Sequence, residues 1–283
     1  MRAVATSAEL RAATDAARRD GATVGFVPTM GALHAGHRSL LAAARRECDL
    51  VVASIFVNPL QFGPGEDLAR YPRDLAADLR AFERDGVDVA FTPEEAEVWP
   101  RPPTVRLRTG RLGERLEGAF RAGHMDGVAT VVAKLLNLVG PARAYFGRKD
   151  AQQLAVVRRM VSDLGFPHQI VACPTIREPD GLAMSSRNAY LSADERAHAT
   201  ALWRGLRAGV QAWLGGERDP AKVEAAAVLV LDETRRIDTQ YVALVDPDSF
   251  EPVSTAEAGH LLAVAARVGP ARLIDNLVLG EPA

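Results

Sequence analysis

The sequence contains few of the residues that mark disulfide-stapled, zinc-binding or membrane-spanning proteins. Its two cysteines, Cys48 and Cys173, lie far apart and outside any CxxC or Cys/His spacing, so neither a disulfide framework nor a zinc site is expected. No apolar run approaches the length of a transmembrane helix. The first 21 residues lack the apolar core of a signal peptide, and three early acidic residues argue against a transit peptide. We therefore expect a cytoplasmic protein with no metal held by side chains and no membrane segment.

An excess of charge of one sign is also absent. The 34 basic and 36 acidic residues leave a formal net charge of -2, which gives no reason to expect nucleic acid or an anionic membrane as a partner. Lys134, Lys149 and Lys222 are the only lysines, so arginine carries nearly all of the basic charge. A chain of 283 residues is long enough for one large domain or two ordinary ones.

Up to about residue 176, short β-branched runs alternate with amphipathic stretches. The predicted strands are 24–27, 50–57, 88–91, 144–146 and 169–172, and the predicted helices are 36–46, 73–85, 128–139 and 151–164. Strands that are apolar at consecutive positions and separated by helices indicate a parallel sheet buried on both faces. The fold class expected is therefore α/β, with a Rossmann-like doubly wound sheet that binds ligands at the carboxyl ends of its strands.

The pattern changes near residue 177. A polar, turn-rich segment is followed by a predicted helix over 193–214, which Ser192 and Glu195 open with a capping box, and by a second helix near 221–235. Three apolar runs between 239 and 279 read as strands. We expect residues 1–176 to form the ligand-binding domain and residues 177–283 to form a smaller C-terminal α+β domain that closes over the site.

The stretch "PTMGALHAGHRSL", residues 28–40, carries paired histidines just after a predicted strand. Gly31 allows a turn there, and Gly36 lets a bulky group approach the start of the next helix, where free N–H groups favour an anion. His34 and His37 flank that helix start and can donate hydrogen bonds to phosphate oxygens. The competing interpretation is that one histidine caps the helix and the other is a surface residue, but the HxGH pairing favours function.

Two further segments suit phosphate binding. "YFGRKDAQQL", residues 145–154, again runs from strand to helix and places Lys149 within reach of a nucleotide, although Asp150 and Gln153 also fit a capping box. "GLAMSSRN", residues 181–188, offers two hydroxyls and an arginine in a loop that begins with glycine. Alone, that loop would most often be a solvated turn, and its position just after the last parallel strand raises its interest.

Amide and apolar side chains follow a third predicted strand. In "SIFVNPLQFGPGEDLARYPRD", residues 54–74, Gln61 suits a small polar organic substrate, although an amide that only ties the loop to itself is as plausible. Arg121, His124 and Asp126 precede or open another helix and could form a wall of the cleft, with functional and structural interpretations evenly matched.

Taken together, these segments resemble a known family. The HxGH motif with a later Met-Ser-Ser-Arg loop is similar to the adenylyl-transfer signature of the class I aminoacyl-tRNA synthetase and nucleotidyltransferase superfamily. Within it, the chain resembles the pantothenate synthetase (pantoate–β-alanine ligase) family through "VPTMGALHAGH", "SIFVNPLQFGPGEDLARYPR", "HMDGVATVVAKLLN", "YFGRKDAQQLAVVRRMV" and "PTIREPDGLAMSSRNAYLS". These ordered motifs span most of residues 24 to 192.

The resemblance implies roles for individual residues. The implied catalytic residues are His37, His34, Lys149 and Arg187, with His37 as the acid on the leaving pyrophosphate side. Gln61 and Gln153 would bind pantoate, and Gln61 would also contact β-alanine. The implied ATP-binding residues are Met30, Gly31, Ala32, Leu33, His34, Ala35, Gly36, His37, Gly147, Arg148, Lys149, Asp150, Ile176, Met184, Ser185, Ser186 and Arg187. Two positions depart from the family pattern, because Arg148 replaces a more usual acidic residue and Ala151 an aromatic one.

The activity implied is ATP-dependent condensation of (R)-pantoate with β-alanine through an enzyme-bound pantoyl adenylate, releasing AMP and diphosphate. Mg²⁺ is expected on the phosphates, and a homodimer is what the family implies. Two other functions remain open. A nucleotidyltransferase acting on a phosphorylated acceptor would need cationic groups where the Gln61 loop is neutral, and a non-enzymatic nucleotide-binding regulator would not need paired histidines.

Overall fold

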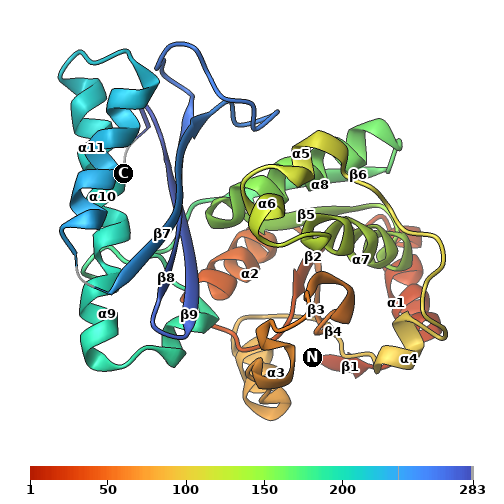
Figure 1. The fold of residues 1–283 in the computed structure, drawn as a ribbon. Coiled ribbons are helices and arrows are strands. Elements are labelled where there is room, and N and C mark those ends of the chain that lie inside the picture. The colour runs from red at the N-terminus through yellow and green to blue at the C-terminus, as the bar shows by residue number, and fades with distance from the viewer. Residues whose placement is uncertain (235, 282–283) are drawn as a thin grey trace. The chain divides into compact units, whose positions relative to one another are not determined.

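The computed structural model describes residues 1–234 and 236–281, and the chain divides into two compact units. The first unit comprises Met1–Arg148 and Val156–Pro174, and the second comprises Lys149–Ala155 and Thr175–Ala283. Figure 1 traces the chain through both units by colour. Each unit is built around a sheet of its own.

A six-stranded parallel sheet forms the centre of the first unit. Its strands, in the order β1-β4-β3-β2-β5-β6, are β1 (Arg2–Val4), β4 (Val89–Phe91), β3 (Leu50–Ile55), β2 (Val24–Thr29), β5 (Ala142–Gly147) and β6 (His168–Cys173). Every neighbouring pair is parallel. The strand order reverses between β2 and β5, which is the point where doubly wound sheets bind ligands. The predicted fold class is confirmed.

The register of this sheet brings several strand ends to one edge. β2 and β3 pair from Val24↔Leu50 to Thr29↔Ile55, and β5 and β6 pair up to Gly147↔Cys173. Since all the strands run in the same direction, the loops that follow β2, β3, β5 and β6 leave from the same edge. The segments that begin at Met30, Phe56 and Arg148 therefore start near one another.

Helices cover both faces of this sheet (Figure 1). The longer ones are α1 (Ser7–Arg19), α2 (Ala35–Glu47), α3 (Leu75–Arg84) and α7 (His124–Val139), and the short ones are α4 (Glu95–Val98), α5 (Gly110–Glu114), α6 (Glu117–Phe120) and the 3₁₀ turns η1 (Pro59–Gln61), η2 (Asp67–Arg70) and η3 (Arg148–Asp150). Leu41 of α2 and Phe82 of α3 are fully buried in a cluster with Val51 and Tyr145 of the sheet. α8 (Ala151–Asp163) begins in the 149–155 segment that groups with the second unit.

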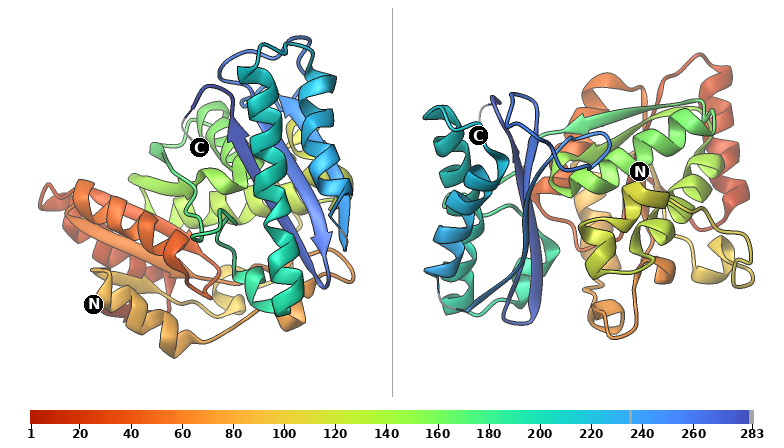
Figure 2. Two further views of the ribbon diagram at one scale, coloured as in Figure 1. Left: turned by 90° about the vertical axis from the view of Figure 1, so that its left-hand side faces the viewer. Right: turned by 45° about the horizontal axis from the view of Figure 1, so that its top comes forward.

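The second unit is an antiparallel sheet with helices against it. Strands β7 (Ile237–Val245), β8 (Leu261–Val268) and β9 (Ala271–Val278) pair in chain order. α10 (Ala201–Leu214) and α11 (Pro220–Asp232) lie side by side along one face of it, as both views in Figure 2 show. Leu206 of α10, Leu231 of α11 and Leu262 of β8 belong to its buried core.

The helix predicted over 193–214 is interrupted. The structure has α9 (Ala193–Ala199) and α10 (Ala201–Leu214), joined at Thr200. The Thr200 hydroxyl donates to the carbonyl of Ala197 at 2.7 Å, and such a local side-chain bond competes with the helical backbone pattern. The Ser192–Glu195 capping box that opens α9 is present as predicted. Within the described residues, no helix is long and apolar enough to span a membrane.

Candidate functional site

The loop after β2 leads directly into α2 and forms an unusual cap. The backbone N–H of Gly36 donates to Nδ1 of His34 at 3.1 Å, and the backbone N–H of His34 donates to Nδ1 of His37 at 3.3 Å. The two imidazole rings lie with their centroids 4.1 Å apart. The pair thus occupies the positions that Ser/Thr and Glu/Gln hold in an ordinary capping box.

This cap determines which nitrogen of each ring carries a proton. A backbone N–H can only donate, so Nδ1 of His34 and of His37 must accept with a lone pair. In a neutral ring the proton is then on Nε2, and each Nε2–H is a hydrogen-bond donor. Both histidines cap the helix, contrary to the interpretation in which only one does so. Because the cap uses Nδ1 alone, it is compatible with a phosphate-binding role for Nε2.

The amide of Gln61 has a defined orientation at the end of η1. Its Oε1 accepts from Nδ2 of Asn58 at 3.1 Å, and its Nε2 donates to Sδ of Met30 at 3.0 Å. Asn58 is itself buried, with its Oδ1 accepting from the indole of Trp99 at 3.3 Å. The donor end of Gln61 therefore faces Met30, the first residue of the histidine loop.

A charged network holds the backbone of Gln61. Arg121 forms a bidentate pair with Glu66, with contacts of 2.8 and 2.7 Å, and its Nη1 lies 2.8 Å from Nε2 of His124. Nδ1 of His124 lies 2.8 Å from the carbonyl oxygen of Gln61. Since arginine can only donate, Nε2 of His124 accepts and its Nδ1–H donates to Gln61. Asp126 acts elsewhere, accepting from the backbone and hydroxyl of Thr109 at 2.8 and 2.7 Å.

The same network keeps His124 neutral. Removal from water, followed by the neighbouring Arg121 charge, lowers the pKa of His124 from 6.5 to about 4. Burial raises the pKa of Glu66, but the hydrogen bonds and charge of Arg121 outweigh this effect and leave it below its usual value. The neutral ring is the form that can both accept from Arg121 and donate to Gln61.

We expect the free energy of unfolding to fall as the pH drops from 6.5 toward 4. In that window the unfolded chain protonates His124 and the folded chain does not, so the unfolded state binds more protons and stability rises with pH. The loss attributable to His124 should reach roughly 2 to 3 kcal/mol near the lower end of the window.

Urea unfolding curves across this pH range measure the effect. His124→Gln should flatten the dependence, whereas the matched change His198→Gln on α9 should not. Equal pH dependence in wild type and His124→Gln would contradict the assignment of a depressed pKa to this residue.

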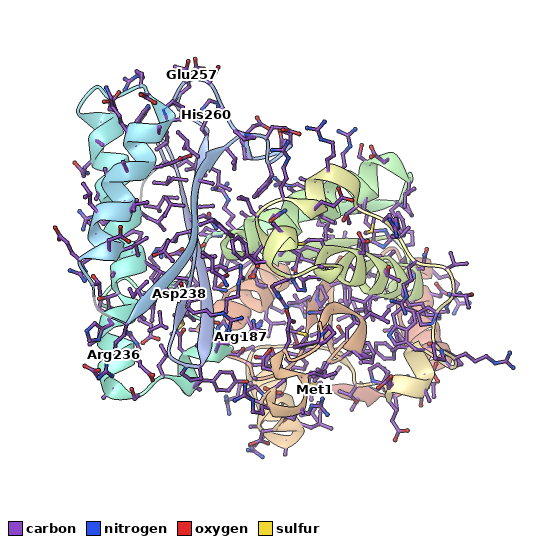
Figure 3. All side chains as sticks on the ribbon, viewed as in Figure 1. Met1, Arg187, Arg236, Asp238, Glu257 and His260 are labelled. Atoms are coloured by element: carbon purple, nitrogen blue, oxygen red, sulfur yellow. The ribbon has the colours of Figure 1, made fainter. Side chains whose placement is uncertain are left out.

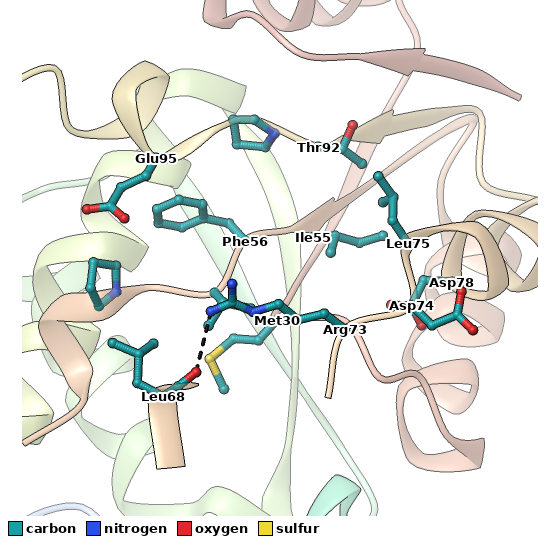
Figure 4. Close-up of a pocket in the computed structure, with 13 residues that line it drawn as sticks. Met30, Ile55, Phe56, Leu68, Arg73, Asp74, Leu75, Asp78, Thr92 and Glu95 are labelled. Carbon is teal, nitrogen blue, oxygen red and sulfur yellow. Dashed lines mark hydrogen bonds between the residues drawn. The ribbon is translucent and has the colours of Figure 1, made fainter. Parts of the chain in front are cut away.

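A pocket of about 310 Å³ opens beside Met30 in the first unit. Ile55, Phe56 and Leu75 form part of its apolar wall (Figure 4). The guanidinium of Arg73 extends across it and donates to the carbonyl of Leu68 at 3.4 Å. Seven of its thirteen lining residues lie in the 54–74 stretch singled out in the sequence, and the fold brings the others beside them from separate segments.

The loop after β6 belongs to the second unit and folds back on itself. The N–H of Met184 donates to the carbonyl of Ile176 at 2.9 Å, which brings together two residues of the predicted nucleotide set. The hydroxyl of Ser185 accepts from the N–H of Arg187 at 3.2 Å. Arg187, labelled in Figure 3, lies in η4 (Ser186–Tyr190), which packs against β9.

Arg177 anchors this loop to the second unit. Its guanidinium binds Asp275 of β9 through contacts of 2.6 and 3.1 Å and stacks over the ring of Trp203 at 3.9 Å. Asp275 is 2% exposed, and burial raises its pKa despite the arginine. A side chain at Gly181, whose φ is +92°, would collide with Trp203. The segment that leads into the Met-Ser-Ser-Arg stretch is therefore tied to β9 and α10 within the second unit.

The backbone of Lys149 is also held by β9. Asn276, the residue after Asp275, donates from Nδ2 to the backbone carbonyl of Lys149 at 2.9 Å. The ammonium group lies 3.8 Å from Oδ1 of Asp150, and the Lys149 side chain is 19% exposed. Gln153 lies in the first turn of α8, two residues after its start at Ala151. Asn276 was not identified from the sequence, since it lies 127 residues from the backbone it holds.

Within residues 1–234 and 236–281, no group of three or more His, Cys, Asp or Glu side chains is arranged to hold a metal ion. The first unit offers imidazole N–H and amide donors, and the second unit offers ammonium and guanidinium donors. Such a set is suited to binding oxygens that carry or develop negative charge.

Comparison with known proteins is consistent across sequence and structure. The model of the family described as Pantoate-beta-alanine ligase matches residues 2–278. The pantothenate synthetase of Acidobacterium capsulatum is 51% identical over 292 residues, covering 99% of this chain and 98% of the relative. That of Acidothermus cellulolyticus is 54% identical over 276 residues, covering 96% and 89%.

Comparison with solved structures indicates the same family. The pantothenate synthetase from Thermus thermophilus gives a TM-score of 0.93 at 50% identity, covering 99% of both chains. A pantoate-beta-alanine ligase from Francisella tularensis, complexed with Beta-gamma ATP and Beta-alanine, gives a TM-score of 0.83 at 31% identity and covers 100% of this chain and 99% of that one.

Proposed function

This chain belongs to the pantoate-beta-alanine ligase family, and from that premise we propose how its own residues carry out the ATP-dependent condensation of pantoate with β-alanine. The carboxylate of pantoate attacks the α-phosphorus of ATP, the bond to the bridging oxygen breaks, and pyrophosphate leaves. The neutral amine of β-alanine then attacks the acyl carbon of pantoyl adenylate, and AMP leaves as pantothenate forms. No covalent bond to the protein is needed, so catalysis is mostly positioning and stabilisation of negative charge.

The hydrogen bonds that the histidine pair accepts from the backbone are the observation that carries the proposal. Both Nδ1 atoms accept backbone N–H groups, so the Nε2–H groups of His34 and His37 are the donors that would meet phosphate oxygens at the start of α2. In this form His37 acts as a neutral hydrogen-bond donor to the leaving pyrophosphate. Lys149 and Arg187 supply positive charge to the triphosphate. The remaining nucleotide contacts are proposed at 30–37, 147–150, Ile176 and 184–186.

One assay tests the reaction. Incubation of the protein with ATP, pantoate and β-alanine should form AMP only when both acids are present, and pantothenate should accumulate in equal amount. AMP or CMP transfer to a phosphorylated acceptor, or nucleotide binding without turnover, would overturn the proposal.

We propose that Gln61 and Gln153 bind pantoate and that Gln61 also contacts β-alanine. The support for Gln61 is its fixed amide, whose Nε2 faces Met30 while Asn58 holds its Oε1. With Oε1 bonded to Asn58, the N–H₂ group is fixed in orientation and has a second N–H besides the one that faces Met30. Such a donor is what a substrate carboxylate or hydroxyl oxygen requires.

Gln153→Glu separates substrate binding from helix capping. In the first turn of α8 a carboxylate serves at least as well as an amide, so thermal stability should be unchanged or slightly raised. An ionised carboxylate cannot donate and repels the carboxylate of pantoate, so the KM for pantoate should rise roughly tenfold or more. Melting curves and initial rates measure both quantities, with Gln211→Glu on α10 as a control for the kinetics. Unaltered pantoate kinetics in Gln153→Glu would remove Gln153 from pantoate binding and leave it with a capping role only.

We further propose that Mg²⁺ enters with ATP. Mg²⁺ usually retains several waters and takes phosphate oxygens as ligands, so it needs few side-chain ligands and is compatible with the donor set described above. When bound, it would neutralise charge on the β- and γ-phosphates. A homodimer and a cytoplasmic location complete the proposal. Sedimentation at several protein concentrations tests the first, and cell fractionation tests the second.

A further inference from the structure

A buried carboxylate on α3 holds the turn that precedes the two histidines. Oδ2 of Asp78 accepts the backbone N–H of Ala32 at 3.0 Å, and Oδ1 accepts that of Leu33 at 2.9 Å. Asp78 is 5% exposed and lies 46 residues along the chain from Ala32. Figure 4 labels it beside Asp74 on the first turn of α3, in the wall of the pocket next to Met30.

The turn at residues 31–33, which Asp78 binds, has an uncommon left-handed backbone conformation. Gly31 has a φ of +81° and Ala32 a φ of +51°, so two consecutive residues are left-handed and one of them carries a side chain. This conformation aims two successive N–H groups at one point, which forms a small anion-binding concavity. The carboxylate of Asp78 occupies that concavity. The fit between carboxylate and turn is close, because a Cβ at Gly31 would lie 2.7 Å from Oδ2 of Asp78.

The turn is connected to the histidines without an intervening residue. Leu33 is followed by His34, whose backbone N–H and ring belong to the cap of α2. A rotation of the backbone at residue 32 or 33 therefore moves two groups, which are the His34 N–H that donates to Nδ1 of His37 and the ring of His34. Displacements of about 1 Å at a reacting centre can cost two orders of magnitude in rate.

We propose that Asp78 is a positioning residue for adenylate formation, and that its carboxylate fixes the 31–33 turn and so places His34 and His37 against the phosphates. The proposal rests on the proposed function, since it assumes that these histidines act on ATP. The contacts of Asp78 described above are made to backbone amides. Its influence therefore passes through the backbone of the turn.

The test compares Asp78→Asn with Asp85→Asn. Asparagine at 78 keeps one acceptor but turns an N–H₂ donor toward one of the two amides, so that contact is lost. Asp85 lies at the other end of α3 and binds Arg38 of α2 at 2.7 Å, so its substitution weakens the attachment of α3 without touching the turn. The single-turnover rate of adenylate formation should fall more than tenfold in Asp78→Asn and stay within twofold in Asp85→Asn.

Two further measurements separate positioning from general damage. Attack of β-alanine on supplied pantoyl adenylate should stay within twofold of wild type in Asp78→Asn, because that step does not expel pyrophosphate. Hydrogen exchange of the 31–34 amides, measured without substrates, should quicken in Asp78→Asn and not in Asp85→Asn. If Asp78→Asn does not fold, Gly31→Ala disturbs the same contact from the side of the turn and should produce the same selective loss.

The outcomes are distinct. Normal adenylation in Asp78→Asn, equal loss in both half-reactions, or an equal effect of Asp85→Asn would overturn the positioning role. Failure of the wild-type protein to form AMP from ATP, pantoate and β-alanine together would instead overturn the proposed function, and the exchange measurement would still decide whether Asp78 holds the turn.

Discussion

His37→Ala is expected to slow adenylate formation by roughly 10²- to 10³-fold while ATP affinity changes much less. The loss corresponds to one donor removed from a site where charge develops on the departing pyrophosphate. That interaction strengthens in the transition state, so it should appear in the single-turnover rate and not in ground-state binding. Rapid quench of enzyme, ATP and excess pantoate measures the rate.

The helix cap requires a second variant. Nδ1 of His37 accepts the N–H of His34, so alanine also removes a cap worth about 1 kcal/mol of stability. Glutamate at position 37 preserves the accepting role of a capping box but cannot donate and repels phosphate. His37→Glu should therefore melt near wild type and be at least as slow as alanine.

His260→Ala is the matched control for both changes. Nδ1 of His260 likewise accepts the N–H of a residue three positions earlier, Glu257, in a loop labelled in Figure 3. Its replacement should cost a similar amount of stability and leave the rate unchanged. Near-normal adenylation by His37→Glu would remove His37 from the mechanism.

Lys149→Ala is expected to impair the ATP half-reaction by roughly 10²-fold and to spare the second half-reaction. The Lys149 side chain is 19% exposed, and its ammonium group lies 3.8 Å from Oδ1 of Asp150. A positive charge in this place can stabilise the negative charge of a triphosphate that binds next to it. Pantoyl adenylate has already lost pyrophosphate, so attack by β-alanine should proceed within a few-fold of the wild-type rate.

Lys222, one of the three lysines of the chain, provides the control for Lys149. Lys222→Ala removes the same charge from a side chain that is 68% exposed and pairs with Glu217 at 3.6 Å. It should leave both half-reactions unchanged. Equal damage to both steps in Lys149→Ala would show that this residue serves some purpose other than binding the triphosphate.

Features encoded over a few residues could be predicted from the sequence. The β-branched runs and the amphipathic stretches indicated the parallel sheet, because side-chain burial repeats at the period of the local backbone. The HxGH stretch could be placed at a helix start for the same reason, since strand, glycine turn and helix follow within fifteen residues. The break at Thr200 was missed, because one hydroxyl competing with the backbone leaves the apolar pattern intact.

That both histidines can cap the helix through Nδ1 and still offer Nε2–H as a donor could be recognised only from the structure. The sequence offered capping and phosphate binding as competing interpretations for His34 and His37. The structure shows that Nδ1 of each ring serves the cap, which makes Nε2 the protonated donor of the neutral ring. Which nitrogen faces the backbone depends on two torsion angles per ring, and residue spacing does not encode them.

The sequence by itself determined the chemical groups and their delivery to strand ends, whereas tertiary structure alone decided what holds each group in place. Asp78 supports the histidine turn across 46 residues, Arg121 and Glu66 pair across 55, and Asn276 holds Lys149 across 127. Hydrogen bonds between such distant partners have no period and no fixed spacing, because they depend on which elements the folded core brings into contact. A buried carboxylate or amide is recognisable as a support only when the backbone it holds is in view.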